Sequence, residues 1–362
     1  MTTILIDGFH AGTGRGVGNY VDNIMFQLEK SVKISKKVTV VVRRNQFSQA
    51  HNFHNVRIIM APSFPFPIWE NIVIPLFCWF LRPSILHSPC NSSPLVPIFS
   101  RRFLTLHDVI FLHGTHKVSP SKNVYQRVGR LYLKINLKIL SRFYSKIFTV
   151  SDFSRNEIIN ELAVLPERVV RIYEGAGSDL KGDGDVFQKT NTVIHFGSDD
   201  PRKNTLNTVR AFQRSEMARN GFKLIVIGSC DQKVFINEID DCAIKNVEFK
   251  GFVSKSELVK FANSAFCLCY CSIYEGFGMP IIEFQEIGVP VITSASTSCS
   301  EVCGDGGILV DPMNIKAITL AMDSLFLDSD LYQDTVTAGY KNIRRFSWEK
   351  CISELVRFYE RY

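Results

Sequence analysis

Apolar runs that suit buried strands alternate with helical patterns along almost the whole chain. Such runs are Thr3 to Ile6, Val38 to Val42 and Phe103 to Leu106 in the first half, and Thr192 to Gly197, Lys223 to Gly228 and Val289 to Ser294 in the second. Strands that alternate with helices form parallel sheets, because each helix returns the chain to the same end of the sheet. A chain of 362 residues is also longer than one ordinary domain. The alternation therefore predicts an α/β protein with two doubly wound parallel-sheet domains that face across a cleft.

A segment rich in glycine and aspartate, from Gly175 to Asp185, separates the two halves. Glycine gives the backbone freedom that a hinge needs. We therefore predict a first domain at 1–178, a linker at 179–190, a second domain at 191–345 and a final segment at 346–362. Asp183 and Asp185 form an Asp-x-Asp pair that could bind a metal, but in such a linker a solvated turn is favoured.

The stretch from Tyr274 to Glu283 combines a strand end, a tight turn and a helix start. The apolar run Ala265 to Ser272 precedes it, and Pro280 suits the first position of a helix that runs to Ile287. Ligands bind at the carboxyl ends of strands in open α/β sheets. Glu275 would lie on the turn and Glu283 in the first part of the helix, where their oxygens could accept hydrogen bonds from a sugar diol. A turn with two solvated glutamates remains the alternative.

Arg202 and Lys203 stand just before or at a second predicted helix start, which follows the strand Thr192 to Gly197. Cations are disfavoured at a helix N-terminus by the helix dipole. A bound anion such as a diphosphate would remove that conflict, because arginine, lysine and free backbone amides could all converge on it. Two solvated cations are the alternative interpretation.

Two features of the first half could also reach a ligand. Gly12 to Tyr20 is a glycine-rich loop before a helix, and such a loop can hold an anion with its backbone amides. Its spacing matches neither the dinucleotide pattern nor the ATP phosphate loop, so a nicotinamide or ATP site is not indicated. A flexible turn remains an alternative. His107 follows the strand Phe103 to Leu106, where it could contact a ligand or serve as a core histidine.

The charge of +7 is unevenly distributed along the chain. Residues 1–150 carry 19 basic and 5 acidic residues, whereas the remainder carries 23 and 30. Residues 122–148 contain seven basic residues and no acidic one, and the last five recur every four residues. On a helix they would form one basic stripe beside apolar residues, which is typical of a helix on an anionic membrane surface. A solvated basic face is the alternative, and no motif supports nucleic acid.

The ten cysteines show no metal-type spacing, since no CxxC occurs. Free and mostly buried thiols fit a reducing cytoplasm. Met1 leads directly into a strand-like run, so no signal peptide is visible. We expect a cytoplasmic protein, peripherally associated with the inner face of the plasma membrane.

These residues together resemble the retaining GT-B glycosyltransferases, specifically glycosyltransferase family 4. The resemblance covers essentially the whole chain and is strongest from Val193 to Pro312. Its landmarks there are Pro201 to Asn204, Glu275 to Glu283, Gly288 to Ile292, Glu301-Val302 and Gly304 to Pro312. In the first half they are Asn19-Tyr20 in the glycine loop, His107-Asp108 and Val150 to Ser154. Within the family the chain looks most like bacterial surface-polysaccharide (O-antigen) transferases that use GDP-mannose or a deoxysugar nucleotide.

The resemblance implies a GT-B fold with two Rossmann-like domains, of which the first binds acceptor and the second binds the nucleotide sugar. The last segment, 346–362, would be a helix that packs back on the first domain. Glu275 and His107 would be catalytic residues at the donor sugar, and Arg202 and Lys203 would neutralise the leaving diphosphate. Many members carry an arginine where this chain has Ser198, so that neutralisation would rest on Arg202 and Lys203 alone.

The remaining implied roles concern the donor and the phosphate loop. Glu283 would hold the ribose hydroxyls, and Val253 would lie near the nucleobase. Phe277, Gly278 and Met279 would line the sugar pocket, and Gly16 would face donor phosphate or acceptor.

The activity implied is metal-independent transfer of mannose or a deoxysugar, with retention, from a nucleotide sugar to a glycan or lipid-linked glycan. A GDP-sugar is favoured as donor, UDP- and dTDP-sugars stay open, and no cofactor is expected. Two other readings stay open: a GT-B epimerase or hydrolase acting on a nucleotide sugar, and a non-catalytic, membrane-docked assembly subunit.

Overall fold

The computed structural model describes residues 3–14, 16–31, 34–47, 53–113, 124–177, 180, 188–230 and 246–362. The chain forms two compact units. The first contains the described residues of 1–112, 121–175 and 347–362, and the second contains those of 113–120 and 176–346. The boundaries between the two units thus fall after Gly175 and after Phe346, whereas the sequence analysis predicted domain ends at residues 178 and 345.

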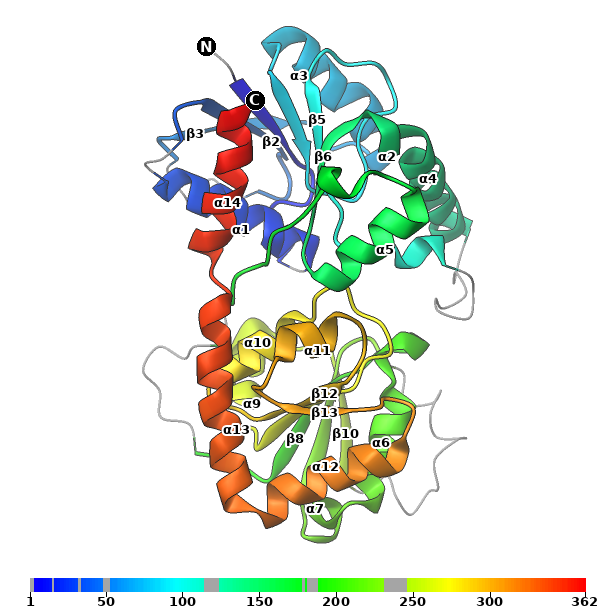
Figure 1. Cartoon of the computed structure of the whole chain (residues 1–362), viewed down its shortest axis with the longest axis vertical. Coiled ribbons are helices and arrows are strands. Elements are labelled where there is room, and N and C mark those ends of the chain that lie inside the picture. The colour runs from blue at the N-terminus through cyan, green and yellow to red at the C-terminus, as the bar shows by residue number, and fades with distance from the viewer. Residues whose placement is uncertain are drawn as a thin grey trace. The chain divides into compact units, whose positions relative to one another are not determined.

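The first unit is built on a seven-stranded parallel sheet of order β3-β2-β1-β4-β5-β6-β7 (Figure 1). Its strands are β1 (Thr3–Gly8), β2 (Lys37–Arg43), β3 (Val56–Ala61), β4 (Ile85–Ser88), β5 (Arg101–Thr105), β6 (Tyr144–Thr149) and β7 (Val169–Arg171). Its helices are α1 (Val17–Lys30), α2 (Phe66–Ile68), α3 (Ile74–Leu81), α4 (Val124–Leu140), α5 (Asp152–Leu162) and α14 (Trp348–Arg361). A π-helical turn, η1 (Trp69–Val73), joins α2 to α3, and short 3-10 turns are η2 (Ile110–Leu112), η3 (Ser141–Phe143) and η4 (Pro166–Arg168).

Helices cover both faces of this sheet because neighbouring strand residues point to opposite sides. On β1, Ile4 and Ile6 pack into the core formed with α1 and α14, whereas Leu5 packs with Trp69 and Ile74 on the other side. Figure 1 shows α14, in red, beside α1 in blue. The last helix of the chain therefore completes the core of the first unit.

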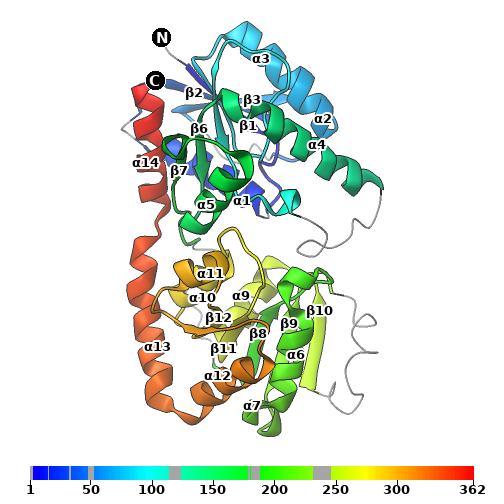
Figure 2. The ribbon, with the colours of Figure 1, turned by 45° about the vertical axis from the view of Figure 1, so that its right-hand side comes forward.

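The second unit contains a six-stranded parallel sheet of order β10-β9-β8-β11-β12-β13 (Figure 2). Its strands are β8 (Thr192–Phe196), β9 (Lys223–Ile227), β10 (Val247–Gly251), β11 (Cys267–Tyr270), β12 (Val291–Ser294) and β13 (Ile308–Val310). Its helices are α6 (Thr205–Arg214), α7 (Glu216–Arg219), α9 (Lys255–Ser264), α10 (Met279–Glu286), α11 (Thr297–Cys303), α12 (Ile315–Leu327) and α13 (Ser329–Asn342), with 3-10 turns η6 (Pro201–Lys203) and η8 (Ile343–Arg345). The prediction of doubly wound parallel sheets is confirmed in each unit.

Strand β8 lies between β9 and β11, so the chain leaves β8 toward one side of the sheet and later returns to its other side. The order of strands reverses at this point, and in open α/β sheets ligands bind at the carboxyl ends of the strands beside such a reversal. The loops that follow β8 and β11 leave this edge of the sheet, and they carry Arg202, Lys203 and Glu275.

The expected basic stripe is wrong in its second part. Helix α4 ends at Leu140, so Arg142 lies in η3 and Lys146 lies in strand β6. Sheet pairing stops the helix: Ile147 and Phe148 of β6 are aligned with both β5 and β7 and are fully buried. The Lys146 ammonium instead donates to the Glu167 carbonyl at 2.6 Å. Among the described residues, no helix is long and apolar enough to span a bilayer.

Candidate active site

The carboxyl ends of β8 and β11 bring together two turns that lie about 70 residues apart in the sequence. Parallel pairing aligns Val193 with Cys267 and Ile194 with Leu268. The turns that follow are then joined by a backbone hydrogen bond, in which Ile273 N–H donates to the Arg202 carbonyl at 2.7 Å. The sheet register therefore decides which residue of the Arg-Lys turn faces which residue of the glutamate turn.

The Arg-Lys turn is held in a defined shape by its flanking residues. Asp200 caps η6 by accepting from the Arg202 backbone N–H at 3.1 Å and from the Arg202 side chain at 3.0 Å. Asn204 closes the turn with a left-handed backbone (φ 57°), a conformation that asparagine tolerates better than most residues. Its buried side chain donates to the carbonyls of Cys271 at 2.9 Å and Pro312 at 2.7 Å.

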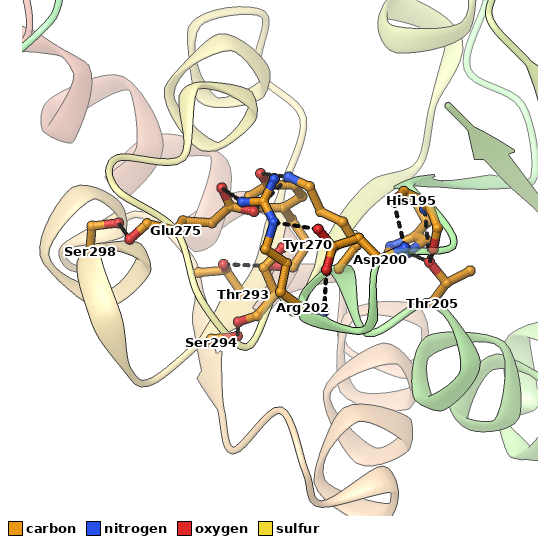
Figure 3. A network of polar contacts seen from close by, with 12 residues as sticks. His195, Asp200, Arg202, Thr205, Tyr270, Glu275, Thr293, Ser294 and Ser298 are labelled. Carbon is orange, nitrogen blue, oxygen red and sulfur yellow. Dashed lines mark hydrogen bonds and ion pairs between the residues drawn. The ribbon is translucent and has the colours of Figure 1, made fainter. Parts of the chain in front are cut away.

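Glu275 forms ion pairs with both cations of that turn. Figure 3 shows Glu275 with Arg202 and Tyr270 of this network. Its Oε1 lies 2.6 Å from Lys203 Nζ, and its Oε2 lies 3.6 Å from an Arg202 guanidinium nitrogen. Lys203 also donates to the hydroxyl of buried Tyr270 at 2.9 Å. Ser298 donates to the Glu275 carbonyl at 2.8 Å, which fixes the backbone of the turn. The result is a compact network of one glutamate, two cations and a tyrosine.

The charges in this network stabilise one another despite burial. Burial alone would raise the pKa of Glu275, but Lys203 and Arg202 hold that pKa below its usual range. Burial would likewise lower the pKa of Arg202, but Glu275 and Asp200 raise it above its ordinary value. An ammonium has three donors, and two of those on Lys203 meet Tyr270 and Glu275, which leaves one for a ligand oxygen. Both cations keep some exposure, 27% for Arg202 and 20% for Lys203.

The residues after Glu275 continue from the turn into α10. Phe277 is buried and packs edge-on against Phe346, with ring centroids 5.7 Å apart. Gly278 caps the helix with φ 98°, a left-handed conformation that glycine adopts without strain. Met279 begins α10, one residue earlier than predicted, and Glu283 lies half-buried within it. Val253 is half-buried just beyond the carboxyl end of β10.

His107 and Gly16 belong to the first unit. His107 Nδ1 lies 3.1 Å from Glu174 Oε1, and its buried Nε2 has no hydrogen-bond partner among the residues that the structure describes. Gly16 is the N-cap of α1 with φ 46°, and apart from its chain neighbours no described residue lies within 4 Å of the place where a Cβ would stand. The structure thus groups Arg202, Lys203 and Glu275 in one network and places His107 and Gly16 in the other unit.

Several residues of the site had no distinct signal in the sequence. Tyr270 is the last residue of an ordinary apolar strand, and Glu174 stands just before the glycine-rich segment that begins at Gly175. His195, which is fully buried, joins Cys269 O at 2.9 Å to Thr205 Oγ1 at 3.2 Å and so supports the start of α6. Asp183 and Asp185 lie outside the described residues. Within the described ranges, no group of three or more His, Cys, Asp or Glu side chains is arranged to hold a metal ion.

The second unit is similar to a known family of proteins. Residues 179–342 match the family model described as Glycosyl transferases group 1. The chain is 32% identical over 229 residues to the O-antigen chain mannosyltransferase B of Escherichia coli. That match covers 59% of this chain and 60% of the relative's length.

Two solved structures match nearly the whole chain in fold. Sucrose-phosphate synthase from Thermosynechococcus elongatus has a TM-score of 0.73 at 16% identity, with 100% of this chain and 99% of that chain covered. HepE of Anabaena, solved in complex with UDP and glucose, has a TM-score of 0.71 at 15% identity, with 100% of both chains covered. At these identities the likeness concerns the fold. Residues 179–342 are therefore similar to the group 1 glycosyl transferase model, and the chain has the GT-B fold that the resemblance of its motifs implied.

Proposed function

We propose that this chain is a retaining glycosyltransferase of bacterial surface-polysaccharide synthesis. It would move mannose or a deoxysugar from a nucleotide sugar to a glycan or lipid-linked glycan. The observation that carries the proposal is the contact of Lys203 and Arg202 with buried Glu275, in the turns that follow β8 and β11 of the second sheet. The match to an O-antigen mannosyltransferase supports the choice of sugar and pathway.

In this proposal the two cations stabilise the charge that develops on the leaving diphosphate. They are held in place before the donor binds, by Asp200 and Glu275, so little reorganisation accompanies the reaction. Each retains donors for a phosphate oxygen, and the guanidinium can bind such an oxygen pair bidentately. The positive charge would come from these side chains, so we propose that transfer needs no metal.

The acceptor hydroxyl would attack the donor carbon on the face from which the diphosphate leaves, which retains the configuration of the sugar. Glu275 would lie near that carbon, Glu283 would hold the ribose, and Phe277, Gly278 and Met279 would line the sugar pocket. Val253 would lie near the base, and Gly16 would face phosphate or acceptor. A GDP-sugar remains our favoured donor, while the UDP complex of HepE keeps UDP-sugars open.

Thermal-shift binding with GDP, UDP, dTDP and ADP, with and without magnesium, tests the donor site. We expect one nucleotide to raise the melting temperature without magnesium, and the K203A variant to lose that rise. Release of sugar without any acceptor would favour an epimerase or hydrolase. No response to any of the four nucleotides would contradict the transferase proposal and favour an assembly subunit.

We also propose that the first unit docks on an anionic membrane through the α4 part of residues 122–148. Five apolar side chains on α4 are exposed at helical spacing: Val124, Val128, Leu131, Ile135 and Ile139. Arg127 and Lys138 are exposed on the same helix. Exposed apolar residues also lie on the segment that runs from α2 through α3, namely Ile68, Ile72, Leu76, Trp79 and Phe80.

The two exposed apolar sets belong to elements that touch one another. Asn71 of η1 donates to Tyr132 of α4 at 2.8 Å, and the rings of Phe66 and Tyr132 are in contact. A surface that combines apolar side chains with Lys and Arg suits the boundary between lipid headgroups and acyl chains. This docking would place the protein at the inner face of the plasma membrane, where lipid-linked acceptors are found.

A further inference from the structure

Tyr270, the last residue of β11, is held in place by contacts with three neighbouring elements of the second unit. Its carbonyl accepts from the Thr293 hydroxyl of β12 at 2.7 Å (Figure 3). Its ring meets Phe196 of β8 edge-on, with ring centroids 6.4 Å apart. A Cβ at Gly278, the N-cap of α10, would lie 3.7 Å from Tyr270 Cε1. The buried phenol therefore presents its hydroxyl at a defined position.

The Tyr270 hydroxyl closes a triangle of hydrogen bonds with Lys203 and Glu275. Lys203 Nζ donates to this hydroxyl at 2.9 Å and to Glu275 Oε1 at 2.6 Å. The hydroxyl in turn forms a hydrogen bond with the Glu275 side chain. An ammonium can only donate, a carboxylate can only accept, and a hydroxyl can do both. Tyr270 therefore accepts from Lys203 and donates to Glu275, so the direction of each bond in the triangle is determined.

The phenol stays neutral in this charged setting. Burial raises the pKa of the Tyr270 hydroxyl well above its ordinary value, and the neighbouring Glu275 carboxylate adds to the rise. The ammonium of Lys203 also lies 5.1 Å from the centroid of the Tyr270 ring. Phenylalanine would keep the ring and this cation–π contact. The substitution Y270F therefore removes the hydroxyl and little else.

The two cations of the turn are held in different ways. Arg202 Nε lies 3.0 Å from Asp200 Oδ2 within the same turn. Lys203 instead reaches the end of β11 and the turn that follows it, where both of its acceptors lie. A lysine side chain is a flexible stem that ends in three rotatable donors. Two acceptors at fixed positions determine the direction of the third N–H, whereas Glu275 alone would let the ammonium rotate.

We propose that Tyr270 is the positioning residue of Lys203, and that its hydroxyl directs the third N–H of the ammonium toward a phosphate oxygen of a bound diphosphate. The choice of a diphosphate rests on the proposed function, whereas the triangle does not. In this arrangement Glu275 supplies the counter-charge and Tyr270 supplies the direction. A phosphate oxygen suits the third N–H, because a cationic donor that keeps 20% exposure binds an anionic acceptor best.

Nitrogen NMR of the full chain labelled with 15N-lysine tests the triangle without any ligand. An ammonium held by two buried acceptors exchanges its protons with water slowly, so we expect exchange at Lys203 to be about tenfold slower than at exposed lysines. The K203R variant assigns the Lys203 signal. In Y270F the exchange at Lys203 should become about tenfold faster than in the wild type. Fast exchange in the wild type, or an unchanged rate in Y270F, would overturn the positioning role.

Titration calorimetry with inorganic pyrophosphate, GDP and UDP tests the contact of the third N–H with phosphate. Y270F should bind pyrophosphate about 3- to 10-fold more weakly, because an oriented hydrogen bond is lost. Tyr332→Phe is the matched control, since it removes a hydroxyl that donates to the Phe266 carbonyl at 3.2 Å just before β11. This variant should bind like the wild type.

Two outcomes of the titration would count against the phosphate contact. Equal affinity of Y270F and wild type for pyrophosphate would overturn it. Absence of binding of all three ligands to the wild type would overturn it together with the proposed donor site. Proton exchange at Lys203 would still decide the role of Tyr270, so its failure and that of the proposed function remain distinguishable.

Activity separates positioning from a merely structural role. A preorganised charge acts on the transition state more than on the bound donor, so Y270F should lower kcat about tenfold beyond its effect on binding. Tyr332→Phe should lower the melting temperature without changing kcat or KM. If Y270F lost stability but kept the kcat and KM of the wild type, Tyr270 would be a structural residue and the proposal would be overturned.

Discussion

Lys203 is the residue whose charge matters most to the candidate active site, because it contacts both the buried Glu275 and Tyr270. Its ammonium is the point charge that offsets the carboxylate, while Arg202 lies farther from it, at 3.6 Å. Either cation could meet a phosphate, but only Lys203 makes a hydrogen bond with Glu275 at 2.6 Å. The consequences of its removal are therefore both chemical and structural.

Replacement of Lys203 by alanine should nearly abolish transfer, with kcat/KM lowered about 10²- to 10³-fold, because a preorganised charge at the leaving diphosphate is lost. It should also reduce the free energy of unfolding by about 1–3 kcal/mol, since Glu275 stays buried with a weaker partner. Steady-state kinetics and thermal denaturation measure the two effects. Lys223→Ala removes an exposed ion pair with Glu248 in the same unit and should change neither. Full activity of K203A would contradict the proposed donor site.

At the scale of elements, a buried carboxyl joins η1 to α4 in the first unit. Glu70 is fully buried, accepts from Ser92 Oγ at 2.6 Å, and accepts from the Tyr132 hydroxyl. Asn136 of α4 adds a contact to the Ser93 carbonyl at 2.7 Å. Burial raises the pKa of Glu70 to about 7, although the hydrogen bonds from Ser92 and Tyr132 oppose that rise.

This raised pKa predicts that stability falls as pH increases. The folded state holds the Glu70 proton up to about pH 7, whereas the unfolded chain releases it near 4.5. The free energy of unfolding should therefore fall between pH 4.5 and 7, by about 3 kcal/mol from this group alone. Glu70→Gln keeps hydrogen-bonding atoms without a titrating proton, so its urea unfolding curves should lose this part of the pH dependence. If the free energy of unfolding changed with pH in the same way in E70Q and in the wild type, the prediction would be contradicted.

The five exposed apolar side chains of α4, together with its basic residues, predict binding to anionic vesicles. Leu131→Gln combined with Ile135→Gln should weaken binding at least tenfold, because the apolar area that enters the headgroup region is lost. Vesicle flotation with phosphatidylglycerol liposomes measures it, and binding should also fall as salt is raised. The control is Leu320→Gln combined with Leu327→Gln, which replaces two exposed apolar side chains of α12 in the second unit. Equal binding by both double variants would contradict the assignment of this surface.

At the scale of the whole molecule, the first and last parts of the chain build one unit. Trp348, Ile352, Leu355 and Tyr359 of α14 are buried in the core that contains Ile4 and Ile6. Tyr359 also meets His87 Nδ1 at 2.5 Å, next to the centre of the sheet. The fold of the first unit therefore requires the last helix.

A substitution at Gly175 tests whether the first unit depends on the packing of α14. Gly175→Ala should lower the free energy of unfolding by about 1–3 kcal/mol, because the added Cβ meets the Trp348 backbone. Chemical denaturation followed by tryptophan fluorescence measures the change. Gly129→Ala on α4 should instead leave stability unchanged or raise it by about 0.5–1 kcal/mol, because outside the helix's own backbone no described residue lies within 4 Å of the added Cβ. Equal stability of both variants would contradict the close packing of α14.

The sequence by itself determined the elements and the chemistry of the donor turn. Strand and helix patterns are local, so the sequence predicted the strands of the second half to within two residues and the start of α10 to within one. Arg202, Lys203 and Glu275 were recognised because each follows a strand that ends at the same edge of a parallel sheet. The alternation predicted two doubly wound sheets, and the family resemblance of the motifs around these turns implied the GT-B fold.

Only the tertiary structure decided which of those residues touch. Lys203 meets Glu275 across 72 positions and His107 meets Glu174 across 67, because sheet registers bring their strand ends together. The end of α4 was likewise decided by the pairing of β6 with its neighbours, which outweighs a basic periodicity that could have continued the helix. Contacts between distant segments depend on packing, and a local pattern of residue types does not encode them.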